Sequence, residues 1–293
     1  MDRNINYESL FNDMIDFTID YIIKNKRAST ILGVSGGIDS TVVSALLYEV
    51  RKKLYLEHKY VISTIGYSLP TNTTNDKEYF VSTLVGNAFM TNFITRNIND
   101  LSTSISDFFI NGNNTCNEIN AFRRGNIKSR LRMMFLYDAA RYNHGFVVGT
   151  DNYTEKLLGF STIGGDALAD YMPLQYLWKT EVYGLANYLL EKYKKEENWS
   201  AVNAINESIK LTPQDGLGIS TSDMVQIGAR NYFDVDDILY SFEKMNVSYE
   251  TFLFSKEYSE LCEKFSSTVV EKVLRRRVNN FKLNLPLEFK PNL

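Results

Sequence analysis

Short apolar runs alternate with longer amphipathic segments along the first half of this chain. Apolar residues at helical spacing predict a leading helix over residues 5–26 and a second helix over residues 41–54. The apolar run at residues 31–32, between these helices, is typical of a buried strand. Further strands are expected at residues 60–67, 91–95 and 145–150, with helices at residues 76–87, 100–110 and 118–142. This alternation predicts an α/β fold, a doubly wound and mostly parallel sheet with helices on both faces.

Polar and glycine residues help to locate the ends of the predicted helices and the loops between them. Asn75 is placed to cap the helix at residues 76–87, because its side chain can accept hydrogen bonds from first-turn N–H groups. The glycine-rich stretch at residues 159–170 predicts an ordered loop, and a further amphipathic helix is expected to begin at Lys179. A lysine at a helix start opposes the helix dipole, which favours an anionic ligand nearby.

The loop after the first strand has the composition of an anion-binding site. Its residues are Gly33, Val34, Ser35, Gly36, Gly37, Ile38, Asp39 and Ser40. The first turn of a helix offers unpaired N–H groups, and glycines let a ligand approach the backbone. Asp39 would repel a bare phosphate, so it indicates a bridging divalent cation. The alternative is a glycine-rich turn in which Asp39 and Ser40 only cap the helix.

A second candidate group follows the strand at residues 145–150. Thr150 and Glu155 lie where that strand ends, and ligands of parallel sheets bind beyond the carboxyl ends of the strands. Glu155 can complete a magnesium site with Asp39, because Mg²⁺ commonly takes one or two carboxylates together with phosphate oxygens. The alternative role of Glu155 is to favour a helix N-terminus through its charge.

The predicted helix at residues 118–142 carries three cations. Lys128, Arg130 and Arg132 are two residues apart, so they do not share one helix face. A guanidinium group that turns toward buried surface needs an anionic partner, which a substrate can supply. Solvated arginines on the helix surface are the alternative.

Composition narrows the class of partner. The net charge of −3 and the pI near 5.6 give no electrostatic footprint for nucleic acid, so none is expected. The two cysteines, Cys116 and Cys262, lie far apart and indicate free thiols in a reducing cytoplasm. The polar N-terminus lacks a signal-peptide pattern, and no apolar run approaches the roughly 20 residues that cross a bilayer. We therefore expect a cytoplasmic protein with no membrane partner.

Five motifs together resemble a known family. The string S-G-G-I-D-S at residues 35–40 is similar to the signature of the N-type ATP pyrophosphatases, α/β enzymes that cut ATP between the α and β phosphates. Four more strings resemble the NAD synthetases of that superfamily in type, order and spacing. They are N-I-K-S-R-L-R-M at residues 126–133, G-T-D-N-x-x-E at 149–155, G-D-x-x-A-D at 165–170 and P-L-x-x-L-x-K at 173–179. The resemblance implies an adenine nucleotide alpha hydrolase-like fold, as a single domain over residues 1–293.

The resemblance also implies a reaction and a set of site residues. The reaction is ATP-dependent amidation of deamido-NAD to NAD with ammonia, through an adenylated intermediate and with release of AMP and pyrophosphate. Asp39 and Lys179 would be catalytic, and Asp39 and Glu155 would hold magnesium. The expected ATP contacts are the loop at residues 33–40, Thr150, Lys179 and Thr212, with Pro213 an alternative alignment partner for Thr212. The expected deamido-NAD contacts are Arg130, Asp170, Phe281 and Lys282.

Three further expectations come from the resemblance. The chain would form a homodimer, and the polar stretch at residues 194–222 would be a mobile active-site loop. Free ammonia would be the nitrogen donor, because the loop at residues 33–40 leaves no room upstream for a glutaminase domain; delivery by a separate glutaminase subunit is the alternative. The segment at residues 212–217 and the helix that begins at Tyr232 are similar to later family segments.

Two positions depart from the family pattern. Ile163 stands where the family usually has a lysine, and Phe281 stands where it usually has a histidine. Both family residues are associated with the deamido-NAD side of the site. The alternative function is therefore a related amide ligase that acts on a different carboxylate. A module that binds nucleotide without chemistry is disfavoured by the presence of Asp39, Glu155 and Lys179.

Overall fold

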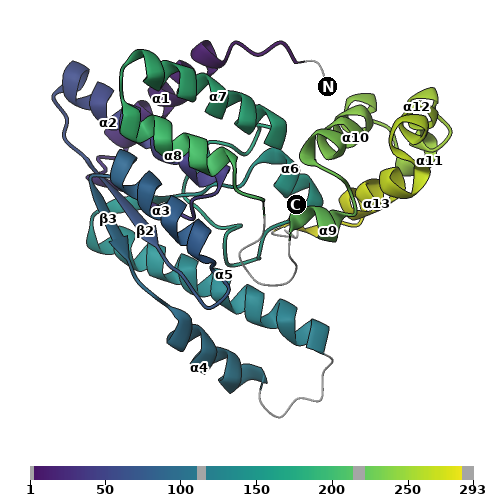
Figure 1. The fold of residues 1–293 in the computed structure, drawn as a ribbon, viewed down its shortest axis with the longest axis horizontal. Helices are drawn as coiled ribbons and strands as arrows, with labels where there is room; N and C mark the ends of the chain where they lie inside the picture. Colours follow the sequence, from purple (N-terminus) through teal and green to yellow (C-terminus); the bar gives the residue numbers. More distant parts are fainter. Residues whose placement is uncertain (1–2, 111–116, 214–221, 286–293) are drawn as a thin grey trace, which may run out of the picture.

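A computed structural model describes residues 3–110, 117–213 and 222–285, and Figure 1 shows its ribbon. Helices and strands alternate through the first half of the chain, and helices alone follow. The first half holds α1 (Tyr7–Lys24), β1 (Ser29–Gly33), α2 (Ile38–His58), β2 (Ser63–Ser68), α3 (Asp76–Phe89), β3 (Asn92–Thr95), α4 (Asn99–Ile110), α5 (Asn117–Tyr142) and β4 (Gly145–Val148). The second half holds α6 (Tyr153–Leu158), α7 (Lys179–Lys195), α8 (Trp199–Ile209), α9 (Asp223–Ile227), α10 (Tyr232–Met245), α11 (Tyr249–Phe252), α12 (Lys256–Phe265), α13 (Ser267–Val278) and the 3-10 helix η1 (Phe281–Asn284).

The four strands form one parallel sheet in the order β3-β2-β1-β4. The register pairs Ile31 of β1 with Ile65 of β2 on one side and with Val147 of β4 on the other. The chain moves outward from β1 through β2 to β3 and then returns to the opposite side of β1. This reversal creates a switch point between β1 and β4, where loops from the two strands diverge. The predicted doubly wound α/β fold is confirmed.

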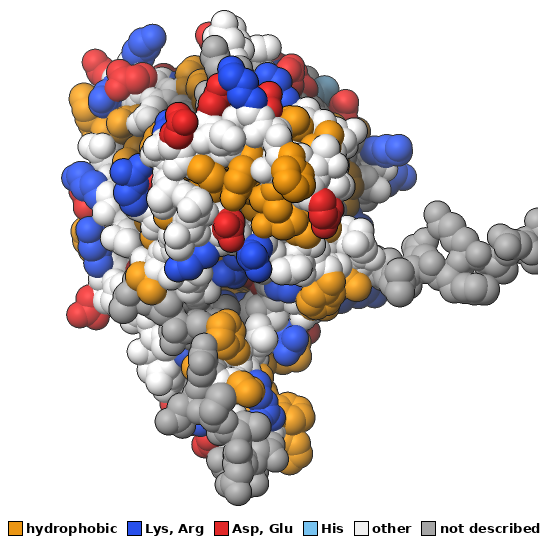
Figure 2. Space-filling view, turned by 90° about the vertical axis from the view of Figure 1, so that its right-hand side faces the viewer, with side chains coloured by type: hydrophobic (Ala, Val, Ile, Leu, Met, Phe, Trp, Pro, Cys, Tyr) orange, Lys and Arg blue, Asp and Glu red, His pale blue; other side chains and the backbone are white. Residues whose placement is uncertain are grey.

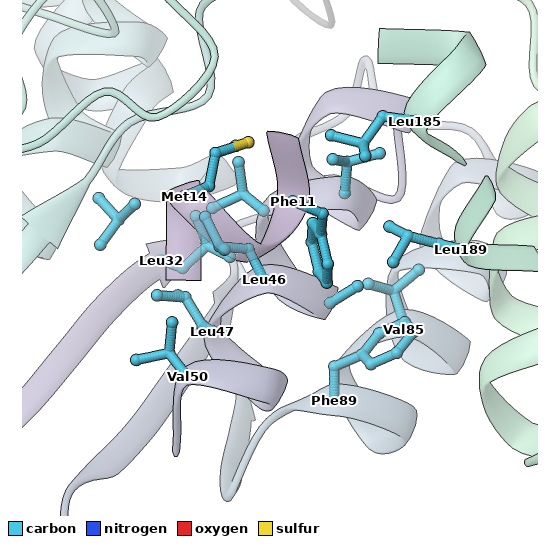
Figure 3. Close-up of a cluster of buried hydrophobic side chains, with 14 of the residues drawn as sticks. Phe11, Met14, Leu32, Leu46, Leu47, Val50, Val85, Phe89, Leu185 and Leu189 are labelled. Carbon is cyan, nitrogen blue, oxygen red and sulfur yellow. The ribbon is translucent and has the colours of Figure 1, made fainter. Parts of the chain in front are cut away.

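Each face of the sheet has its own hydrophobic core. Successive side chains of a strand point to opposite faces, so Leu32 packs against α1, α2, α3, α7 and α8, while its neighbour Ile31 packs against α5. Figure 3 shows how Phe11 of α1, Leu46 of α2 and Leu189 of α7 meet in the first core. Strands covered on both faces are buried throughout, which explains their continuous apolar runs.

A third hydrophobic cluster lies at the right of Figure 1, in the lobe formed by α6 and α9 to α13. Leu157 and Leu158 of α6 belong to this cluster, and Trp178 joins it from the residue before α7. Seen from that side, hydrophobic side chains gather in a patch between charged groups (Figure 2). Helix α7 packs on α1, α2 and α8 and also contacts α10 of the lobe, so it holds the lobe against the rest of the molecule.

The prediction of a mobile loop at residues 194–222 is wrong for most of the residues that the structure describes there. Residues Trp199–Ile209 form α8, which Asn198 caps through a hydrogen bond to the N–H of Ala201. Ala201, Ala204 and Ile205 are buried in the first core, and of the polar side chains of α8 only Ser208 is fully buried with them. The polar composition therefore reflects one exposed helix face. Residues 214–221, which include Gln214 to Leu217 of the predicted segment, lie outside the described residues, as does Cys116.

Other local predictions are confirmed. Asn75 caps α3 in a capping box with Glu78, and α7 begins at Lys179. Cys262 is a free cysteine. Across the described ranges, every helix is too short or too polar to span a bilayer.

The turn between β1 and α2 is packed from both sides. Gly36 has a φ of +87°, and a Cβ at this position would lie 2.7 Å from the backbone nitrogen of Ser82 in α3. On the other side, the Ser208 hydroxyl of α8 donates to the Gly36 carbonyl at 2.8 Å. Only glycine combines this left-handed conformation with so close an approach of another backbone.

We expect Gly36→Ala to lower the free energy of unfolding by about 1–3 kcal/mol, because alanine is strained at positive φ and meets α3. Gly37→Ala is the matched control. Gly37 has a φ of −64°, and a Cβ there would meet only the Ser35 hydroxyl at 3.4 Å. Urea unfolding of both variants measures the difference. Equal losses would contradict the role assigned to Gly36.

Candidate active site

A cavity of about 480 Å³ opens at the switch point between β1 and β4. Its wall combines the loops after both strands with the start of α7, one side of α5 and the end of the C-terminal lobe. Cavities of this size at the carboxyl edge of a parallel sheet are the usual ligand sites of doubly wound folds.

The predicted anion-binding loop at residues 33–40, which we call the phosphate loop, forms one wall of this cavity. Every residue from Gly33 to Ser40 except Gly36 lines it. Within the loop, Ser35 and Ser40 exchange a hydrogen bond between hydroxyls at 3.1 Å, and the Ser82 hydroxyl donates to the Val34 carbonyl. The first turn of α2 faces the cavity with its N–H groups and the positive end of its dipole, a suitable place for phosphate oxygens.

Three charged side chains from distant parts of the chain meet beside this loop. The Lys179 ammonium donates to Asp39 Oδ2 at 2.5 Å and to Glu155 Oε1 at 2.9 Å. The side chain of Lys179 is only 4% exposed, and its nitrogen lies 5.1 Å from the centre of the Tyr232 ring. A buried ammonium is stable only with such partners. We call Asp39, Glu155 and Lys179 the charged triad.

Asn152 connects the triad to the backbone. Its side-chain amide donates to Asp39 Oδ1 at 2.8 Å, while its side-chain oxygen accepts from the N–H of Glu155. Glu155 Oε2 in turn accepts from the N–H of Asn152, which completes a capping box at the start of α6. The two roles considered for Glu155 therefore coexist, since one oxygen caps the helix and the other meets Lys179.

Burial and the neighbouring charges shift the pKa values of Glu155 and Lys179. Burial raises the pKa of Glu155 to about 7, although the nearby Lys179 ammonium acts in the opposite direction. Burial acts to lower the pKa of Lys179, but the carboxylates of Asp39 and Glu155 outweigh this effect and raise the pKa well above its usual value. Asp151, next to the triad, also has a strongly raised pKa, through burial and then the charges of Asp166 and Glu155. Lys179 thus remains charged, while Glu155 and Asp151 keep their protons to a higher pH than ordinary carboxyl groups.

Three further cations line the cavity. Arg132, Arg276 and Lys282 reach it from α5, α13 and η1. Arg276 lies over the Phe160 ring at 4.0 Å and donates to the Leu158 carbonyl. Lys282 donates to the carbonyls of Gly159 and Ser161. These cations give the cavity a second region that suits an anionic substrate group.

The predicted site residues divide into two groups. Thr150, Thr212 and Lys282 line the cavity together with the triad and the phosphate loop. Arg130, Asp170 and Phe281 do not. The exposed Arg130 donates through Nε to the Ile163 carbonyl, Asp170 Oδ2 accepts from the N–H of Val147, and Phe281 is 64% exposed. Their predicted contacts with deamido-NAD have no support in the cavity wall and stay predictions.

Some residues of the site were missed by sequence reasoning. Arg276 had no predicted role, and Asn152 was named only within its motif. Tyr232, which lies over Lys179 and donates to Asp223 Oδ2 at 2.6 Å, was assigned only to a helix. Asn152 alone had a local signal, because asparagine three residues before glutamate is a helix-start pattern.

Comparison with known proteins decides the family. The sequence pattern of the family described as NAD synthase matches residues 10–286. The chain belongs to the NAD synthase family. The predicted family, and with it the prediction of an ATP-dependent NAD synthetase, is confirmed.

Members of the NAD synthase family resemble this chain over nearly its full length. The NH3-dependent NAD+ synthetase of Helicobacter hepaticus is 30% identical and aligns over 95% of this chain and 98% of its own. That of Fusobacterium nucleatum is 27% identical, over 97% of this chain and 96% of its own.

Solved structures share the fold. NMN synthetase from Francisella tularensis has a TM-score of 0.73 at 21% identity, over 99% of this chain and 100% of that chain. NH3-dependent NAD synthetase from Campylobacter jejuni has a TM-score of 0.67 at 22% identity, over 98% and 100%.

We expect part of the pH dependence of stability to come from Glu155. Its pKa is 4.5 in the unfolded chain and about 7 in the folded protein, so the folded state holds the proton more tightly. The associated stability is therefore present at low pH and lost as the pH rises from 4.5 to 7, by about 3 kcal/mol in total. Glu155→Gln removes this titration and should flatten the curve of unfolding free energy between pH 5 and pH 8.

Urea unfolding across this pH range measures the effect. Glu191→Gln is the control, because the Glu191 side chain is 63% exposed and pairs with Lys194 at the surface. An unchanged slope in Glu155→Gln would show that the folded protein does not raise this pKa.

Proposed function

We propose that the protein amidates deamido-NAD with ammonia in two steps that share the cavity. In the first step the nicotinate carboxylate attacks the α-phosphorus of ATP, and pyrophosphate leaves. In the second step ammonia attacks the activated carbonyl carbon, AMP leaves with the bonding electron pair, and the nitrogen releases one proton to solvent as the amide of NAD is formed. The observation that carries this proposal is the buried Lys179 ammonium, held between Asp39 and Glu155 at the N-terminus of α2.

The phosphate loop and Lys179 suit the first step. The loop would bind the phosphates of ATP through first-turn N–H groups and the Ser35 and Ser40 hydroxyls. Negative charge builds up on the departing pyrophosphate, and a fixed ammonium nearby stabilises it without reorganisation. Thr150 and Thr212 lie on the same wall and would contact ATP. None of these roles requires a nucleophile from the protein, so catalysis consists of positioning and charge stabilisation.

Asp39 and Glu155 fit a magnesium ion as its protein ligands. Among the residues that the structure describes, no group of three or more acidic, histidine or cysteine side chains could hold a metal alone. Two carboxylates beside a phosphate site match the usual preference of Mg²⁺, which completes its shell with phosphate oxygens and water. When bound, the ion would offset charge on the phosphates. Lys179 already touches both carboxylates, so it would keep them oriented beside the ion.

The acceptor region is the cationic side of the cavity. Arg132, Arg276 and Lys282 would receive the anionic groups of deamido-NAD, and they come from elements other than those that form the phosphate loop. Separate binding regions for the two substrates in one cavity would support the alignment that an in-line attack needs.

A different carboxylate is the second candidate acceptor. Ile163 and Phe281 replace the lysine and histidine usual at these positions, and Arg130, Asp170 and Phe281 lie off the cavity wall. One structurally similar protein is named an NMN synthetase. The carboxylate that amidation would convert into NMN is therefore the first alternative acid to test.

The test is pyrophosphate release from ATP and magnesium with ammonium, with and without deamido-NAD, while NAD is followed by its enzymatic reduction. We expect release that depends on deamido-NAD, with NAD formed in step. Lys179→Met should abolish release, whereas Lys194→Met, at an exposed position on the same helix, should not. Release only with the mononucleotide acid would reject deamido-NAD as acceptor, and no release with either acid would reject the ligase.

We also propose a homodimer in the cytoplasm. The outer helices of one sheet face expose large apolar side chains: Leu101, Phe108 and Phe109 on α4, and Ile119 and Met134 on α5. Exposed apolar clusters of this kind usually mark protein interfaces, and a second copy of the chain would cover this one. Light scattering at micromolar concentration should give twice the chain mass, and Phe108→Glu should shift the mass toward that of one chain. A wild-type mass of one chain would contradict the dimer.

A further inference from the structure

Asp236 lies directly behind the charged triad but does not line the cavity. It belongs to α10 in the C-terminal lobe and is 1% exposed. Its Oδ1 accepts from the Thr154 hydroxyl at 2.5 Å, and its Oδ2 accepts from the N–H of Thr180 at 2.8 Å. Each carboxylate oxygen therefore meets a donor, and the two donors belong to different helices, α6 and α7.

The two donors are the chain neighbours of two triad residues. Thr154 precedes Glu155, and Thr180 follows Lys179. The Thr154 hydroxyl, which donates to Asp236, also accepts from the N–H of Lys179 at 2.9 Å. One buried carboxylate and one hydroxyl thus connect the first turn of α6 to the first turn of α7. Hydrogen bonds to a charged acceptor in a low-dielectric interior are stronger than neutral ones at the surface.

We infer that Asp236 is a positioning residue that fixes the distance between Glu155 and Lys179 by holding the backbones that carry them. The triad needs such support, because its members lie on separate helices and its geometry depends on the relative placement of α6 and α7. The N-terminus of α7 adds to the effect, since its Thr180 N–H donates to Asp236 at the positive end of the helix dipole. The effect of Asp236 on catalysis rests on the proposed function, whereas its effect on the backbone does not.

The test uses two isosteric variants and one control. Asp236→Asn replaces one acceptor oxygen by an NH2 group, and Thr154→Val removes the hydroxyl while it keeps the shape. Asp237→Asn makes the same chemical change at the next residue of α10, where Asp237 pairs with Lys264 at the surface. We expect kcat for pyrophosphate release to fall about 10–100-fold in both isosteric variants, as for other residues that orient active-site groups, with little change in the KM for ATP. The control should keep its kcat.

Hydrogen exchange supplies a readout that does not depend on activity. The amides of Lys179 and Thr180 should exchange faster in Asp236→Asn and Thr154→Val than in the parent protein, while amides in β1 and α2 keep their rates. Faster exchange in all of these segments would mean that Asp236 supports only global stability, and unchanged exchange at Lys179 and Thr180 would overturn the inference.

A double-mutant cycle completes the test. If Asp236 and Thr154 act through one network, the double variant should lose about as much kcat as the worse single variant. Fully additive losses would contradict a shared network. Failure of the proposed function would instead appear as a parent protein without turnover, in which case the exchange experiment alone decides the inference.

Discussion

The structure depends on one buried ammonium group. Lys179 is placed where solvent cannot stabilise its charge, and the carboxylates of Asp39 and Glu155 take the place of that solvent. Such an arrangement tolerates little error, because the removal of one partner leaves an uncompensated charge. The segments that carry the three groups are far apart in sequence and must all be correctly packed before the ammonium is satisfied. The same interaction therefore stabilises the junction of α2, α6 and α7 and prepares a charged surface for phosphates.

The sheet topology makes this meeting possible. The phosphate loop follows β1, and Glu155 follows β4, so both groups come to one edge only because β4 pairs with β1. The chain returns from β3 to β4 through α4 and α5, which lie on the sheet face opposite to α1 and α2. This path leaves the carboxyl edge of β1 and β4 open. The C-terminal lobe closes this opening from the side and contributes Arg276 and Lys282 to the wall. The ligand region is thus a property of strand order, to which later helices add charge.

Much of this organisation was predictable from sequence, and the reasons are local. Buried parallel strands have apolar runs, so the strands were predicted correctly. The glycines and small polar residues at 33–40 indicated the phosphate loop, and Asn75 indicated the start of α3. The helix α8 was missed because its exposed face gives the stretch a polar composition while its small buried residues are weak signals.

The cavity wall was harder to predict because it depends on tertiary neighbours. Nothing in the sequence near Arg276 or Tyr232 indicates that they lie beside residues more than 50 positions away. Conversely, Arg130 and Asp170 were assigned by family motif, and the structure uses their polar atoms for backbone contacts instead. Their predicted substrate contacts remain untested.

The residues of the cavity wall are far apart in sequence, which affects the stage of folding at which the cavity is complete. Contacts between distant residues form late, because a long loop must close before they contribute free energy. The wall runs from Gly33 to Lys282, so it is complete only after the sheet, α7 and the C-terminal lobe have all assembled. A partly synthesised or partly unfolded chain would lack Arg276 and Lys282 from the wall even if the loop at residues 33–40 were formed. Binding that needs both groups of residues would therefore begin only in the fully assembled protein.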